Sequence, residues 1–154
     1  MDFKEVVNEE LVFVQESFGD YKEVIRYLSV HLREKGFVKQ GFMNEVLKRE
    51  LKNPTGLYLG DINVAIPHTE AKYVNKSGIA IATLKTPIKF RRMDDPEETI
   101  PVHIVFLIAV NNPKNYVKLL SKLTSSFSDK VFVKSLYSAR NSAEFVSLIK
   151  NVIS

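Results

Sequence analysis

The stretch Val102-His103-Ile104-Val105-Phe106-Leu107-Ile108-Ala109-Val110 is an almost unbroken run of apolar residues. Such a run is typical of a central strand that is covered on both faces. It ends at Asn111-Asn112-Pro113, where an asparagine can cap a helix and the proline can occupy the first helical position. The stretch therefore predicts a buried strand that leads directly into a helix.

Other strand-like and helical segments surround this run. Short apolar runs at residues 11–14, 64–66 and 78–84 are bounded by turn residues and predict further strands. Apolar residues at helical spacing predict helices whose buried faces are Tyr21, Val24, Ile25, Leu28 and Leu32; Phe42, Val46, Leu47 and Leu51; Tyr116, Leu119, Leu120, Leu123 and Phe127; Val131, Phe132 and Leu136 after Ser128; and Phe145, Leu148, Ile149 and Val152. We therefore expect an α/β (α+β) fold, with a central mixed β-sheet flanked by helices on both sides.

The size and composition of the chain indicate one domain. It has 154 residues, of which 45% are hydrophobic, and it contains no linker, repeat or low-complexity stretch. We expect residues 1–154 to form a single compact domain. No apolar run reaches the roughly 18 residues of a membrane span, and the first ten residues are too acidic and too interrupted for a signal peptide. These features predict a soluble, cytoplasmic protein.

The composition also argues against several kinds of chemistry. The chain has no cysteine, which excludes disulfides, thiolate nucleophiles and sulfur-ligated metals. Its three histidines lie far apart in the sequence, and its six glycines form neither of the common phosphate-binding loops. The net charge of +4 is scattered rather than gathered in a basic stripe, so docking to an acidic protein fits at least as well as nucleic-acid binding. We expect no metal and no cofactor.

The candidate for chemistry lies in Val64-Ala65-Ile66-Pro67-His68-Thr69-Glu70. Proline ends the strand pairing, so His68 should lie at a sheet edge and be partly exposed. Its imidazole could be a nucleophile, a proton carrier or a metal ligand. A single histidine is nevertheless more often structural. We favour the structural interpretation for His31, beside the apolar face of the first helix, and for His103, near the start of the central strand.

Further blocks accompany this motif in order along the chain: Arg49-Glu50, Pro54-Thr55-Gly56-Leu57, Pro87-Ile88-Lys89-Phe90-Arg91-Arg92-Met93 and the run at 102–110. Together they resemble the ordered blocks of the mannitol/fructose-type IIA family (PTS EIIA type 2) of bacterial phosphoenolpyruvate-dependent sugar phosphotransferase systems. The resemblance implies that His68 accepts a phosphoryl group from the phosphocarrier HPr and hands it to a cysteine of a IIB component, which works with a membrane IIC component. It also implies that Arg49 steadies the phosphoryl group.

The residue types fit this role. Phosphoryl transfer depends on in-line positioning and on stabilising charge over the equatorial oxygens. Arg49 offers a fork of N–H donors, Thr69 offers a hydroxyl, and the helix that opens at Asn112 offers the positive end of its dipole. Without the resemblance, Arg49 would be interpreted as a solvated helix charge and Thr69 as a turn or cap residue.

Within the family, the Pro-Thr-Gly-Leu and Pro-His-Thr-Glu blocks resemble the galactitol-type branch more than the nitrogen-regulatory branch. Tyr116 aligns where mannitol- and nitrogen-type members carry a second active-site histidine. It either supplies a supporting hydroxyl or simply buries its ring. Three classes of function are open: a transport phosphocarrier with phosphotransferase activity, a regulatory relative whose histidine phosphorylation controls a partner, and a non-catalytic protein-binding module in which His68 is structural.

Overall fold

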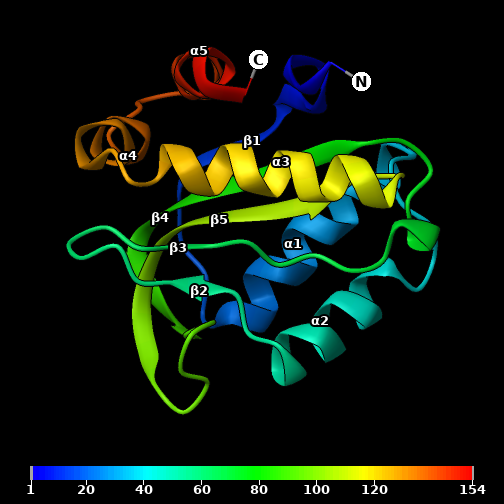
Figure 1. Ribbon diagram of the computed structural model, residues 1–154, viewed down its shortest axis with the longest axis horizontal. Helices are drawn as coiled ribbons and strands as arrows, with labels where there is room; N and C mark the ends of the chain where they lie inside the picture. Colours follow the sequence, from blue (N-terminus) through cyan, green and yellow to red (C-terminus); the bar gives the residue numbers. More distant parts are fainter. Residues whose placement is uncertain (1, 154) are drawn as a thin grey trace.

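A five-stranded mixed sheet forms the centre of the computed structural model, which describes residues 2–153 (Figure 1). The strand order is β1-β4-β5-β3-β2, which places β5 in the middle, as the apolar run predicts. β1 runs parallel to β4 and β3 runs parallel to β5, whereas the β4–β5 and β2–β3 pairs are antiparallel. The strands are β1 (Val7–Glu16), β2 (Gly56–Leu57), β3 (Val64–Ala65), β4 (Gly78–Arg91) and β5 (Thr99–Ala109).

Helices cover both faces of this sheet. α1 (Tyr21–Glu34) and α2 (Phe42–Lys52) lie on one face, and α3 (Pro113–Ser126), α4 (Lys130–Tyr137) and α5 (Ser142–Ile153) lie on the other (Figure 1). Successive residues of β5 belong to opposite sides of the core, because side chains alternate along a strand: Phe106 packs with the α3 side and Leu107 with the α1 side. Two short 3-10 helices, η1 (Phe3–Val6) and η2 (Ala71–Tyr73), complete the chain. The expected fold class is confirmed.

Side-chain caps begin α1 and α3, and one of them, Asn112, is the cap that the sequence suggests. Asp20 accepts a hydrogen bond from the backbone N–H of Glu23 at 2.9 Å and begins α1. Asn112 accepts hydrogen bonds from the N–H groups of Lys114 and Asn115 at 2.9 and 3.3 Å, with Pro113 as the first residue of α3. These bonds satisfy amide groups that have no partner inside the helix. None of the described helices is long and apolar enough to cross a membrane.

The expected buried face of α2 is wrong at its end. Leu51 is 57% exposed, whereas Glu50 is only 4% exposed. Phe42, Val46 and Glu50 follow one another at intervals of four residues, so they share the inner face of the helix. Glu50 can occupy this face because Thr55 supplies hydrogen bonds to its carboxylate.

The expected buried face of α4 is wrong at its start. Asp129 rather than Ser128 caps this helix, by accepting a hydrogen bond from the N–H of Phe132 at 3.1 Å. With this start, Val133 and Leu136 face the core and Val131 is 76% exposed. The strand predicted over 78–84 is also longer than expected, since β4 resumes after an irregular stretch between Thr83 and Ile88.

Candidate functional site

His68 lies where the carboxyl ends of the parallel strands β3 and β5 meet. Beyond β3, the backbone continues alongside β5: the N–H of Ile108 donates to the carbonyl of Pro67 at 3.1 Å, and His68 pairs with Ile108. The side chain is partly exposed, as expected. The expected sheet edge is wrong, because His68 lies beside the end of the central strand. This end of an α/β sheet is where ligands commonly bind.

The backbone fixes the orientation and tautomer of the His68 imidazole. Nδ1 lies 2.8 Å from the carbonyl oxygen of Ile66 and donates a hydrogen bond to it. Burial lowers the pKa of His68; the Ile66 carbonyl opposes this effect, and the positive charge of Arg49 adds to it. At neutral pH the ring is therefore neutral and carries its free lone pair on Nε2.

A surface hollow brings together four residues that the sequence singles out. His68 and Thr69 come from the loop after β3, Arg49 comes from the last turns of α2, and Tyr116 comes from the first turn of α3. The start of α3 therefore lines the hollow, as the dipole argument requires. The remaining lining residues are Glu70, Ala71, Lys72, Pro113, Val117 and Leu120.

Arg49 and Thr69 have unused hydrogen-bonding groups in this hollow. The Arg49 side chain is exposed and has no hydrogen bond or ion pair with any residue from 2 to 153. Thr69 is 5% exposed, and its hydroxyl has no partner within the same range. An anionic group that enters the hollow would meet a free guanidinium and a free hydroxyl.

Tyr116 packs its ring beside His68. The two ring centres lie 5.8 Å apart at an angle of 43°. Tyr116 is only 7% exposed, and its hydroxyl donates a hydrogen bond to the carbonyl of Ile108 at 3.1 Å. Burial raises the pKa of Tyr116 to about 12, so the hydroxyl is protonated. Because this hydroxyl already has a backbone acceptor, the geometry favours ring burial over direct contact with a bound phosphoryl group.

Sequence reasoning did not identify Lys72 and Glu50. Lys72 lines the hollow, and its Nζ lies 3.8 Å from the carboxylate of Glu70. Glu50 accepts hydrogen bonds from the N–H of Thr55 at 2.9 Å and from its hydroxyl at 2.9 and 3.1 Å. Burial raises the pKa of Glu50 to about 7, against the opposing effects of the Thr55 hydrogen bonds and the charge of Arg91. Glu50 stands next to Arg49 in the Arg49-Glu50 block, but the family resemblance assigned a chemical role only to the arginine.

His31 and His103 have structural surroundings and do not line the hollow. Nδ1 of His103 accepts a hydrogen bond from the N–H of Asn63 at 3.1 Å, and its ring meets that of Tyr137 edge-on at 5.3 Å. The ring of His31 lies 4.6 Å from that of Phe13. These contacts agree with the structural interpretation of both histidines.

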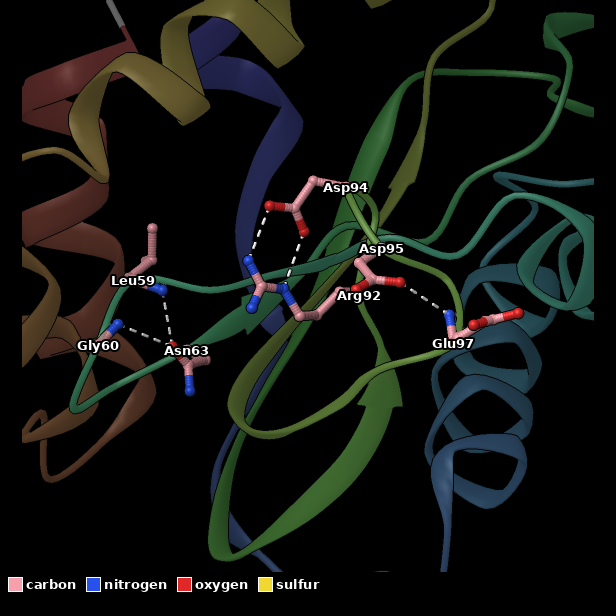
Figure 2. Close-up of polar contacts among 7 residues, drawn as sticks. All are labelled: Leu59, Gly60, Asn63, Arg92, Asp94, Asp95 and Glu97. Carbon is pink, nitrogen blue, oxygen red and sulfur yellow. Dashed lines mark hydrogen bonds and ion pairs between the residues drawn. The ribbon is translucent and has the colours of Figure 1, made fainter.

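Asn63 organises the loop that precedes β3 (Figure 2). Its Oδ1 accepts hydrogen bonds from the N–H groups of Leu59 and Gly60 at 2.7 and 3.1 Å, as Figure 2 shows. Its Nδ2 donates to the carbonyl of Pro101 on β5 at 3.0 Å. Asn63 therefore fixes the start of β3, the strand that leads to the histidine.

The donor set can bind and accept an anionic group. It combines a neutral imidazole nucleophile, a guanidinium without a partner among residues 2–153 and a hydroxyl, which are the groups that phosphoryl transfer uses. Groups of three or more histidine and acidic side chains that could hold a metal ion do not occur in the described part of the chain.

Comparisons with known proteins identify the family to which the chain belongs. The pattern of the family "phosphoenolpyruvate-dependent sugar phosphotransferase system, EIIA 2" matches residues 5–152. The galactitol-specific EIIA component of Escherichia coli (strain K12) is 30% identical over 120 residues, which cover 78% of this chain and 79% of that protein.

Two longer proteins match through a small part of their length. A multiphosphoryl transfer protein of Escherichia coli O6:H1 is 29% identical over 151 residues, covering 97% of this chain but 17% of that protein. The transcriptional regulator ManR of Bacillus subtilis is 32% identical over 139 residues, covering 89% of this chain and 20% of the regulator.

A similar fold occurs in the solved complex of enzyme IIAMTL and phosphorylated enzyme IIBMTL from Escherichia coli. The matched chain has a TM-score of 0.76 at 22% identity, covering 94% of this chain and 96% of that chain. Since the family pattern matches nearly the whole sequence, the chain belongs to the EIIA type 2 family of the phosphoenolpyruvate-dependent sugar phosphotransferase system.

Proposed function

We propose that this chain is a phosphocarrier, the phosphotransferase component of a sugar phosphotransferase system. Nε2 of His68 accepts a phosphoryl group from phosphorylated HPr and passes it to a cysteine of a IIB component, which serves a membrane IIC component during uptake of a sugar or sugar alcohol. One observation carries the proposal: a neutral imidazole, held through Nδ1 by Ile66, lines the same hollow as the guanidinium of Arg49, which has no partner in the described part of the chain.

The geometry supports the following steps. The lone pair of Nε2 attacks phosphorus in line while the bond from phosphorus to the donor atom breaks. Nδ1 keeps its proton, so the phosphorylated ring carries a positive charge that the Ile66 carbonyl stabilises. The forked N–H groups of Arg49 pair with phosphoryl oxygens, and the Thr69 hydroxyl adds a donor. In the second transfer a cysteine thiolate attacks phosphorus, and the bond to Nε2 breaks.

The hydrogen bond to Ile66 assists both transfers. Before the first, it keeps the lone pair on Nε2, where the nucleophile is needed. Before the second, it keeps a proton on the ring, so the departing imidazole leaves as a neutral molecule rather than as an anion. Tyr116 forms a wall of the hollow in this scheme and serves as a supporting residue.

The relatives guide the proposal for partners and substrate. Similarity to the galactitol-specific component supports a galactitol-type transport system, and the complex of IIAMTL with phosphorylated IIBMTL supports a IIB partner. The multiphosphoryl transfer protein matches only through 17% of its length, so its combined activities are not transferred to this chain. We propose that residues 1–154 act as one cytoplasmic domain.

Mass measurement after incubation with phosphoenolpyruvate, enzyme I and HPr tests this function. The protein should gain the mass of one phosphoryl group. A phosphoryl group on imidazole is a phosphoramidate, so acid should remove it and base should not. An unmodified protein in the presence of active HPr would contradict the proposal and favour the non-catalytic binding module.

A regulatory role is the second candidate, and the similarity to the regulator ManR favours it. Both roles require phosphorylation of His68, so phosphorylation alone does not separate them. Transfer of the phosphoryl group from the labelled protein to the cysteine of a IIB component does. Transfer supports the transport phosphocarrier, and a phosphorylated protein that no IIB component discharges supports regulation.

A further inference from the structure

We propose that Glu50 and Thr55 are positioning residues that hold Arg49 in place opposite His68, through hydrogen bonds that run from the end of α2 to the imidazole. The inference rests on the proposed function and extends it. Neither residue lines the hollow, so neither is expected to touch the phosphoryl group.

The first link joins α2 to the loop that follows it. Both oxygens of the Glu50 carboxylate accept from the Thr55 hydroxyl, at 3.1 and 2.9 Å, and one of them also accepts the Thr55 N–H at 2.9 Å. Glu50 and Thr55 are 4% and 3% exposed. The connection is therefore shielded from competing water, which favours a single geometry.

The second link joins this loop to the histidine. The carbonyl of Thr55 accepts a hydrogen bond from the N–H of Ile66 at 3.3 Å. The carbonyl of the same Ile66 lies 2.8 Å from Nδ1 of His68. A continuous series of bonds thus connects the residue next to Arg49 with the proposed nucleophile.

Hydrogen bonds from Arg91, a residue of the sheet, also hold the end of α2. The guanidinium of Arg91 on β4 donates hydrogen bonds to the backbone carbonyls of Glu50, at 3.4 Å, and Leu51. Arg49 itself has no partner within residues 2–153. Its placement in the hollow therefore depends on the backbone that these contacts hold.

The choice of residue at position 50 argues against a purely structural role. Position 50 continues the inner stripe of Phe42 and Val46, where an apolar side chain would be stable without hydrogen bonds. Burying a carboxylate there is unfavourable unless hydrogen bonds compensate for its lost hydration, and Thr55 must supply them. The presence of a buried carboxylate at position 50 is explained if Glu50 orients the neighbouring Arg49.

Two substitutions, Glu50→Leu and Thr55→Val, test the inference by single-turnover transfer from phosphorylated HPr. Each removes hydrogen bonds at nearly constant volume, and Thr55→Ser keeps the hydroxyl as a rescue. Thr83→Val is the matched control, because the buried Thr83 hydroxyl accepts the N–H of Gln15 at 2.8 Å and does not line the hollow.

Glu50→Leu and Thr55→Val should slow transfer about ten- to a hundredfold, as expected when a reacting group is misplaced by about 1 Å. Glu50→Leu leaves the Thr55 N–H without its acceptor, as Thr83→Val does for the Gln15 N–H, so both should lose stability to a similar extent, but only Glu50→Leu should slow transfer. In an Arg49→Ala background, the same two substitutions should change the rate less than about twofold.

Two results would overturn the inference: normal transfer by Glu50→Leu and Thr55→Val, or an equal slowing with and without Arg49. Thr55→Ser should transfer at close to the wild-type rate, and a rate as slow as that of Thr55→Val would contradict the role of the hydroxyl. Failure of the proposed function itself is distinguishable, because the wild-type protein would then remain unlabelled.

Discussion

Nδ1 of His68 and the carbonyl oxygen of Ile66, two residues apart in the chain, lie 2.8 Å from each other. The contact holds the histidine ring against its own backbone and leaves Nε2 to face a ligand. Burial lowers the pKa of His68, and the charge of Arg49 contributes to the same effect. The nucleophile is therefore prepared by local geometry and by the neighbouring α2.

Replacing His68 by Ala should abolish phosphorylation by HPr and leave the fold intact, because His68 is only partly buried at the end of the sheet. His31→Gln and His103→Gln should still be labelled, since both rings lie in structural surroundings. Intact-mass spectrometry with circular dichroism checks both statements. Continued labelling of His68→Ala would refute the central assignment.

Replacing Arg49 by Lys should slow transfer although the formal charge is kept. A guanidinium pairs with two phosphoryl oxygens, whereas an ammonium group acts as a point charge. Loss of a positioned donor costs on the order of 10²-fold in comparable oxyanion sites, and Arg49→Ala should lose at least as much as Arg49→Lys. Rapid-quench transfer assays measure these rates. Wild-type rates in both variants would return Arg49 to the role of a solvated surface charge.

Replacing Tyr116 by Phe should leave phosphorylation nearly unchanged. The hydroxyl donates to the Ile108 carbonyl, so its removal should lower the free energy of unfolding by about 1 kcal/mol. Denaturant unfolding and transfer rates are the measurements. Slower transfer together with a shorter lifetime of phosphorylated His68 would instead show that the phenol has taken over the role of the second imidazole.

The stability of the protein should depend on pH through Glu50. Burial raises the pKa of Glu50 from 4.5 to about 7, so the folded state binds this proton more tightly than the unfolded state. The resulting stabilisation is complete below about pH 4.5 and disappears as the pH rises through about 7, a change of about 3 kcal/mol. Comparing denaturant unfolding of the wild type and Glu50→Gln across this range isolates the effect. A constant difference between the two proteins would contradict it.

Replacing Gly56 by Ala should destabilise the protein. A Cβ at this position would lie 2.6 Å from the backbone carbonyl oxygen of Arg91, which cannot move aside as a flexible side chain can. Such overpacking typically costs about 1–3 kcal/mol. Gly19→Ala is the control, since its new Cβ would meet only the mobile end of the Glu23 side chain. Equal thermal unfolding of the two variants would be the contrary result.

Local signals predicted the start of α3 well, because the cap Asn112 acts through bonds within one turn. The strand order could not be derived in this way, since β1 pairs with a strand made of residues 78–91. The burial of Glu50 contradicts the usual exposure of glutamate, and it depends on Thr55.

The candidate site was predictable to different degrees. The position of His68 followed from a proline and a short strand, and Arg49 entered only through the family resemblance. The sequence contains no sign that Nδ1 of His68 would bond to Ile66, because this contact depends on the path of the backbone after β3. The same holds for the hydroxyl of Tyr116, whose acceptor lies on β5.

The strand order has a consequence for protein synthesis. β1 leaves the ribosome before β4, yet β4 is its only neighbour in the described sheet. The antiparallel pair of β4 and β5 is joined by a short turn and can form as soon as both strands are available. A nascent chain therefore carries β1 without a partner while α1, α2 and the loop around His68 are being translated.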